Sequence, residues 1–186
     1  ELYIAKGEEG ELTPQLWELQ DGDRLFCDPK IRGHFTMDEI EPNKNLVMMS
    51  TGTGLAPFRA MLHEHMGKGL WKRFVVIHGV RYQDDLGYRD ELENLAYKHK
   101  DVLYVPSLSR EPKDSPWKGL RGRIPLILDP DVWDIYLGFE IDPEDTHVFL
   151  CGNPAMIDTV NPMLEERGFK IDKKKDPGNI HFERYW

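Results

Sequence analysis

The stretch that most constrains the fold is residues 46–59, where an apolar run is followed by two glycines and an apolar-periodic segment. This order predicts a buried strand, a tight turn and a helix. Gly52 and Gly54 carry no side chain and tolerate positive φ, so a phosphate can approach the backbone there. Pro57 suits the first position of the helix, and the free N–H groups of a helix start attract an anion. The Gly-x-Gly-x-x-Pro spacing differs from the common dinucleotide fingerprint, and a plain strand-to-helix connection is the alternative.

The composition limits the classes of protein to which the chain can belong. The length of 186 residues fits one domain or slightly more, and the net charge of −9 argues against nonspecific nucleic-acid binding. No apolar run approaches the roughly 18 residues of a membrane helix, and no secretory signal is present. Cys27 and Cys151 are too few for a disulfide framework, so a cytoplasmic location is expected. The seven histidines form no metal-binding cluster, so no metal site is expected.

From residue 46 onward, strand-like and helix-like segments alternate. The predicted strands are residues 46–49, 74–77, 102–105, 147–150 and 180–186, and the longer helices are residues 85–99 and 154–167. This alternation predicts an α/β fold with a doubly wound, five-stranded parallel sheet over residues 45–186.

Residues 1–44 have a different pattern. Two short β-rich runs, residues 2–5 and 24–27, flank a short helix that begins with Thr13 as N-cap and Pro14 in the first turn. So few residues cannot form a core of their own. We therefore expect them to be the end of a domain whose beginning is absent.

The predicted strands end in residues that suit a ligand. These ends are residues 50–54, 78–81, 107–111 and 151–154. In open α/β sheets, ligands bind at the carboxyl ends of the strands, so we expect these four ends to form one site.

Three arginines belong to this edge. Arg81 and Arg110 follow the second and third strands, and Arg123 comes after the next loop. The planar guanidinium fork suits a phosphate, and a dinucleotide with a 2′-phosphate needs such donors. The alternative is that each arginine pairs with one of the many surface carboxylates.

The last strands add three further candidates. Cys151 can be a small buried residue, or it can pack against a nicotinamide ring; no neighbouring histidine activates it as a nucleophile. Tyr185 and Trp186 can close the core, or they can stack on a planar ligand.

Taken together, these motifs resemble the bacterial type of ferredoxin–NADP+ reductase. The matching residues are 51–58, 78–81, 109–111, 122–125, 151–156 and 185–186. The resemblance implies that Arg81, Arg110 and Arg123 hold the 2′-phosphate of NADP(H). It implies an NADP(H) site made of Thr51, Gly52, Thr53, Gly54, Pro57, Arg81, Ser109, Arg110, Arg123, Gly152, Asn153, Pro154 and Met156.

The resemblance also implies a flavin site. Residues 1–44 would be a partial antiparallel β-barrel segment, the C-terminal part of an FAD-binding domain, and residues 45–186 the NADP(H)-binding domain. Tyr185 or Trp186 would stack on FAD. The FAD pyrophosphate would lie on Gly10, Glu11, Leu12 and Thr13. The family's Arg-x-Tyr-Ser or Arg-x-Tyr-Thr motif for the flavin does not occur in this sequence.

The implied activity is electron transfer between NADP(H) and ferredoxin or flavodoxin through FAD, with Cys151 and Glu183 lining the hydride-transfer position. One alternative is the reductase component of an oxygenase system. Another is an NADP(H)-binding module that is inactive alone because its FAD site is incomplete. The oligomeric state is not predicted.

Overall fold

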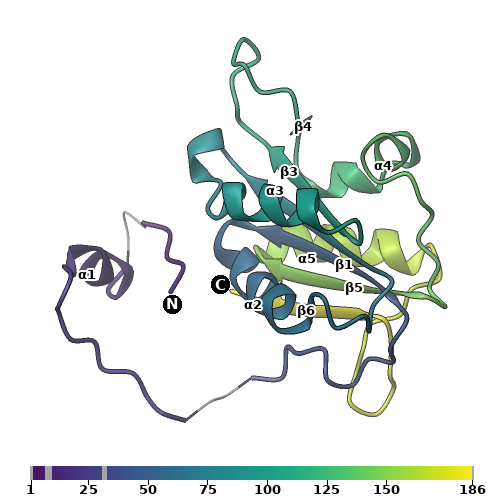
Figure 1. Ribbon diagram of the computed structural model, residues 1–186, viewed down its shortest axis with the longest axis horizontal. Coiled ribbons are helices and arrows are strands. Elements are labelled where there is room, and N and C mark those ends of the chain that lie inside the picture. The colour runs from purple at the N-terminus through teal and green to yellow at the C-terminus, as the bar shows by residue number, and fades with distance from the viewer. Residues whose placement is uncertain (1, 7–9, 31–32, 186) are drawn as a thin grey trace.

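The computed structural model describes residues 2–6, 10–30 and 33–185, and its centre is one parallel sheet of six strands (Figure 1). The strands are β1 (Asn45–Thr51), β2 (Arg73–Val80), β3 (Val102–Leu108), β4 (Leu120–Arg121), β5 (Thr146–Gly152) and β6 (Ile180–Arg184). Their order across the sheet is β4-β3-β2-β1-β5-β6, and every neighbouring pair is parallel. The predicted α/β class and parallel sheet are confirmed. The prediction of five strands missed β4, which has only two residues and follows a Pro- and Gly-containing loop.

The central strands form because their apolar runs are covered on both faces. In β1 every residue from Asn45 to Ser50 is buried, and Met48 stands between Val76 of β2 and Phe149 of β5. A parallel strand that is buried on both faces needs a continuous apolar run rather than an alternating one. The same continuity explains why these strands could be located from sequence.

Helices cover both faces of the sheet (Figure 1). One face packs against α2 (Leu55–His65) and α3 (Arg89–Lys98), and the other against the 3₁₀ helix η3 (Ile124–Leu128), α4 (Pro130–Tyr136) and α5 (Pro154–Glu165). The 3₁₀ turns η1 (Gly52–Gly54) and η2 (Gln83–Asp85) precede α2 and α3. The sequence analysis predicted Pro57 at the first position of the helix, but it is the third residue of α2. The N–H that proline lacks is still among those that have no partner at the start of an α-helix.

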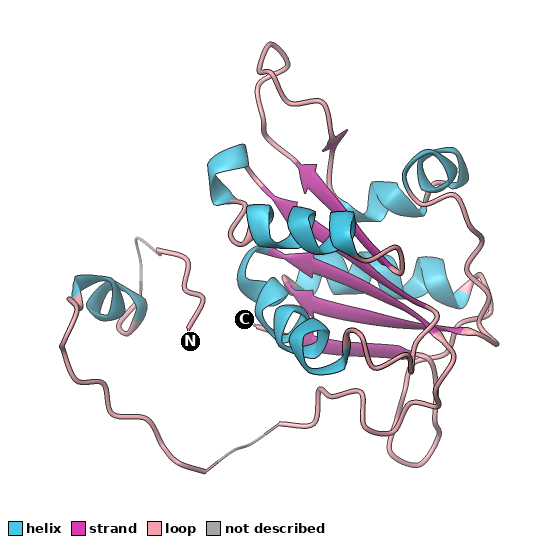
Figure 2. Cartoon of the chain, viewed as in Figure 1, coloured by secondary structure: helices cyan, strands magenta, loops and turns pink. Residues whose placement is uncertain are grey.

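The segment before the sheet contains one helix, α1 (Thr13–Glu18), and is otherwise irregular in the described ranges (Figure 2). The strands predicted at residues 2–5 and 24–27 are not formed there, and neither is the expected antiparallel barrel segment. A strand needs a hydrogen-bonded neighbour, and none of the described residues supplies one to these runs. Phe26 is consequently 90% exposed. The division of the chain at residues 44 and 45 stays a prediction.

Candidate functional site

A cleft of about 1180 Å³ lies at the carboxyl ends of the strands. In Figure 2 the arrowheads of the long strands point toward the side on which the N-terminal segment lies. Nine of the predicted site residues line this cleft: Thr51, Gly52, Thr53, Arg81, Ser109, Arg110, Arg123, Asn153 and Met156. The turns after β1, β2, β3, β4 and β5 therefore contribute to one cavity, as the parallel sheet predicts.

The floor of the cleft is made by two turns whose backbones touch. A Cβ atom on Gly54 would lie 2.3 Å from the carbonyl oxygen of Cys151, and one on Gly152 would lie 2.4 Å from Thr51 Oγ1. Side chains at these two positions would force the ends of β1 and β5 apart. Gly54 and Gly152 thus lie below the cleft, while Pro57 and Pro154 stand in the first turns of α2 and α5.

Gly52 has the opposite environment. Its φ is +52°, and a Cβ atom built on it meets nothing within 4 Å. The residue therefore presents bare backbone to the open cleft, and a side chain there would fill the space. This geometry fits a phosphate group approaching the main chain.

Side chains join the two turns to each other. The backbone N–H of Asn153 donates to Thr51 Oγ1 at 2.8 Å. The side chain of Asn153 in turn accepts from the N–H of Ala155 at 2.8 Å and caps the start of α5. The first turn of α5 is thus fixed beside the glycine turn, with its positive dipole end at the cleft.

His78 fixes the glycine turn from below, a role that the sequence analysis missed. Its Nε2 is 3.2 Å from the carbonyl oxygen of Gly52, and its Nδ1 is 3.4 Å from the hydroxyl of Tyr104. Burial lowers the pKa of His78 to about 4, so the imidazole is neutral near pH 7. Nε2–H then donates to Gly52, and Nδ1 accepts from Tyr104. The available signal was a single histidine that extends the apolar run of residues 74–77.

The three predicted arginines follow three adjacent strands and line the same cleft. Arg81 follows β2 and Arg110 follows β3, and the N–H of Arg110 donates to the carbonyl of Arg81 at 2.9 Å. Arg123 comes two residues after β4, next to Gly122. Gly122 is bonded to β3 through its N–H, which donates to Leu108, and through its carbonyl, which accepts from a serine hydroxyl at 2.9 Å.

These three side chains are also available for a ligand. Arg59, Arg89 and Arg184 each form an ion pair with a carboxylate, at 3.0, 2.7 and 2.6 Å. Within the described part of the chain, Arg81, Arg110 and Arg123 are exposed and form no such pair. The alternative explanation, in which they serve as partners for surface carboxylates, therefore has no support in this arrangement.

Cys151, Glu183 and Tyr185 meet beside the end of β5. Cys151 and Glu183 are register partners, and the Tyr185 side chain forms a hydrogen bond with the thiol. Cys151 is fully buried, and burial raises its pKa to about 12, so it is a neutral thiol that does not line the open cleft. Glu183 is exposed, and Trp186 lies outside the described residues. The catalytic roles of Cys151 and Glu183 stay predictions.

The predicted FAD residues of the N-terminal segment lie at the start of α1. Leu12, and not Thr13, is the N-cap of this helix, and no side chain caps it. Gly10, Glu11, Leu12 and Thr13 do not line the cleft. Lys6 and Trp17 from the same segment do, and the sequence analysis did not select them. Tyr185 is 38% exposed.

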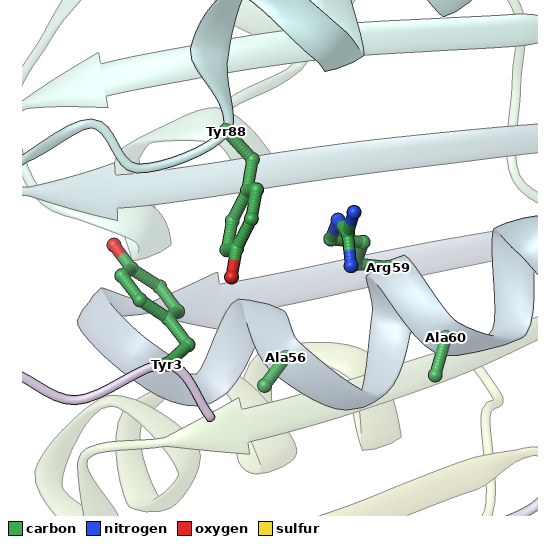
Figure 3. Close-up of a pocket in the computed structure, with 5 residues that line it drawn as sticks. All are labelled: Tyr3, Ala56, Arg59, Ala60 and Tyr88. Carbon is green, nitrogen blue, oxygen red and sulfur yellow. The ribbon is translucent and has the colours of Figure 1, made fainter. Parts of the chain in front are cut away.

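A second pocket, of about 230 Å³, lies between the N-terminal segment and α2 (Figure 3). Tyr3 packs edge-on against Tyr88 there, with ring centroids 5.1 Å apart. Its arginine, Arg59, is bound to Glu91 and lies 4.4 Å from the centre of the Tyr88 ring. Because this charge is already paired, the second pocket is a poor site for a phosphate.

The described residues contain no group of three or more His, Cys, Asp or Glu side chains arranged to hold a metal ion. None of the helices they form has the length and apolar character needed to cross a bilayer.

Comparison with known proteins identifies relatives with the same organisation. Residues 48–161 match the family described as "Oxidoreductase NAD-binding domain". The flavodoxin/ferredoxin–NADP reductase of Buchnera aphidicola subsp. Schizaphis graminum is 36% identical over 187 residues, which cover 100% of this chain and 72% of that protein. The protein of the same name from Escherichia coli is 32% identical over 190 residues, covering 100% of this chain and 75% of the relative.

A solved structure agrees with these relatives. The ferredoxin NADP+ reductase from Neisseria gonorrhoeae, crystallised with bound FAD and NADP, superposes with a TM-score of 0.87 at 27% identity. The match covers 97% of this chain and 72% of that one. The similarity therefore includes the N-terminal segment as well as the sheet.

Proposed function

Because the chain belongs to the flavodoxin/ferredoxin–NADP reductase family, we propose that its cleft holds NADP(H) with the 2′-phosphate between Arg81, Arg110 and Arg123. One observation carries this assignment: three exposed guanidinium groups, which have no carboxylate partner among the described residues, follow three adjacent strands. Guanidinium groups bind phosphate oxygens through paired N–H donors. A nucleotide without the 2′-phosphate would leave these charges without a counterion.

The pyrophosphate belongs at the glycine turn. Gly52 presents bare backbone to the cleft, Thr53 lines it beside Gly52, and the capped start of α5 faces it from β5. A dinucleotide laid from the arginines across this turn carries its nicotinamide toward the end of β5. There Cys151 lies beneath Tyr185, with Glu183 beside it, so a ring that contacts the thiol requires Tyr185 to move.

The enzyme is a flavin-dependent oxidoreductase whose cofactors are FAD and NADP(H). Bound FAD would supply an acceptor for the hydride of NADPH and a donor of single electrons. We assign its pyrophosphate to residues 10–13 and one face of its ring to Tyr185. No Arg-x-Tyr-Ser motif in residues 1–186 adds a further flavin contact to these. We also assign residues 1–44 to the FAD side and residues 45–186 to the NADP(H) side.

The names of the relatives indicate the class of electron acceptor. They are reductases of flavodoxin or ferredoxin, and we propose one of these small electron carriers as the partner. A reductase that serves an oxygenase is the second candidate, because such proteins share the sheet and differ in the acceptor. Reduction rates with each purified carrier distinguish the two.

Substitution of Arg110 tests the nucleotide assignment. Loss of a charge-assisted hydrogen bond costs roughly 1.5–3 kcal/mol, so Arg110→Ala should weaken NADPH binding about 10- to 150-fold. NADH binding should change little, because NADH has no 2′-phosphate. Both dissociation constants are measured by titration of the purified protein.

Arg73→Ala provides the matched control for this titration. It removes the same charge from the opposite end of β2, where Arg73 lies over Phe139. Equal weakening of both nucleotides by Arg110→Ala would show that Arg110 does not contact the 2′-phosphate.

A further inference from the structure

A fourth arginine lies close to the proposed phosphate-binding group but faces away from the cleft. Arg121 is the last residue of β4, two positions before Arg123, and it does not line the cleft. Its Nη1 donates to the carbonyls of Glu111 and Pro112 at 3.0 and 2.9 Å. Its Nη2 donates to Ser115 Oγ and the carbonyl of Trp117 at 3.0 and 3.1 Å. One guanidinium group therefore holds the β3–β4 loop, residues 109–119, at four points.

Proposed phosphate ligands lie at the start of this loop and just after β4, the strand that follows it. Ser109 and Arg110 begin the loop, and Arg123 follows β4. The loop forms no helix or strand, and most of its side chains are exposed. Exposed irregular segments have many conformations unless side chains hold them. The N–H of Arg110 is bonded to Arg81 and that of Gly122 to Leu108, so it is the course of the chain between these two points that depends on how the loop is fixed.

Trp117 is the second anchor of the loop. It is buried, its Nε1 donates to the carbonyl of Leu120 at 3.0 Å, and the guanidinium of Arg89 lies 5.1 Å from the centre of its ring. The carbonyl of Trp117 is one of the acceptors of Arg121, so the two anchors are joined. Arg121 is the member that links the start of the loop to its end.

We propose that Arg121 is a positioning residue that sets the preference for NADPH over NADH, because it holds Arg110 and Arg123 where both reach the 2′-phosphate. This inference rests on the proposed function. The Nη groups of Arg121 donate to loop carbonyls and a hydroxyl, so this residue acts through its neighbours and does not contact the nucleotide. Its role is set by the fork geometry of the guanidinium, not by its charge.

Lysine separates geometry from charge. Arg121→Lys keeps the positive charge, but a single ammonium nitrogen cannot span four acceptors on two sides of the loop. We expect Arg121→Lys and Arg121→Leu to raise the dissociation constant of NADPH by roughly 5- to 20-fold, since part of the charge-assisted contact is lost. The dissociation constant of NADH and the kcat should stay at the wild-type values. Thermal melting is followed in parallel, and Ser115→Ala, which removes one acceptor, should give a smaller shift in the same direction.

Several results would overturn the proposal. If Arg121→Lys binds NADPH like the wild type while Arg121→Leu does not, the charge alone is responsible. If the Arg121 variants raise the dissociation constants of NADPH and NADH equally, Arg121 does not set the preference between the two nucleotides. If the lysine variant does not fold and Ser115→Ala leaves NADPH binding unchanged, the bracing role is wrong. Arg110→Ala, measured in parallel, separates this proposal from the proposed function. If Arg110→Ala weakens NADPH selectively and the Arg121 variants do not, only the role of Arg121 is refuted. If Arg110→Ala shows no selectivity, the phosphate site is refuted together with the role of Arg121.

Discussion

His78 links the glycine turn to the acid stability of the protein. Burial lowers its pKa from 6.5 to about 4, so the unfolded chain binds a proton more readily than the folded one between these pH values. The stabilising contribution is complete above pH 6.5 and is lost as the pH falls toward 4. From this residue alone we expect the free energy of unfolding to drop by about 2 kcal/mol between pH 7 and pH 5. Urea unfolding at the two pH values measures it.

His78→Gln is the variant for this measurement, because its amide N–H can still donate to Gly52 while the side chain no longer titrates. Its unfolding free energy should fall less between pH 7 and pH 5 than that of the wild type. The control is His147→Gln. Burial also lowers the pKa of His147 to about 4, but this residue lies at the other end of the sheet, away from the glycine turn. An unchanged pH slope in His78→Gln would mean that the buried imidazole is not neutral in the folded state.

At the scale of single residues, the sequence indicated the candidate ligand-binding residues. It did not indicate the residues that hold the ligand-binding segments in place. Arg81, Arg110 and Arg123 could be selected because a strand end followed by arginine has a functional explanation. The roles of His78 and Arg121 depend on contacts with Gly52 and with a loop, and no local spacing predicts such contacts. For Cys151 the sequence left two interpretations open, a small buried residue or a contact with the nicotinamide; the residue is fully buried, and its contact with the ligand stays a prediction.

At the level of elements, the contact between the turns after β1 and β5 gives Gly54 and Gly52 different surroundings, so substitutions at the two positions should have different effects. Gly54→Ala would place a Cβ atom 2.3 Å from the Cys151 carbonyl oxygen, so we expect a stability loss of about 1–3 kcal/mol, typical of overpacking. Gly52→Ala has open space but a φ of +52°, which costs about 1 kcal/mol, and its methyl group would enter the proposed phosphate position. Gly54→Ala should therefore mainly lower the unfolding free energy, and Gly52→Ala should mainly weaken both nucleotides.

Chemical denaturation and nucleotide titration of the two variants check this contrast. A Gly52→Ala protein that binds NADPH and NADH as tightly as the wild type would exclude phosphate contact at that backbone.

The elements that could be predicted are those whose sequence alone determines burial. The runs in β1, β2 and β5 are continuous and apolar, and such runs indicate a strand inside a sheet whatever surrounds it. β4 has two residues and exists only because β3 offers it hydrogen bonds. The reverse holds for residues 2–5 and 24–27, whose β-rich composition does not produce strands without a neighbouring strand.

On the scale of the whole molecule, residues from the N-terminal segment and from the sheet share one cleft. Lys6 and Trp17 face it from the N-terminal segment, and the glycine turn and arginines face it from the sheet. A common cleft brings two cofactors together, so we expect the purified protein to show a flavin absorption band that NADPH bleaches under anaerobic conditions. A colourless protein that still binds NADP+ would instead support the second class of function, a nucleotide-binding module without activity of its own.

The attachment of the three arginines to β2, β3 and β4 has a consequence for engineering. Neighbouring strands lie about 4.8 Å apart, so the backbones at Arg81 and Arg123 are separated by roughly two such steps, and only long side chains can converge from there on one phosphate. Hydrogen bonds between the strands determine this spacing of the strand ends, and exchanging Arg81, Arg110 or Arg123 leaves them in place. Cofactor choice should therefore be alterable by exchanging individual arginines, while the sheet beneath them remains intact.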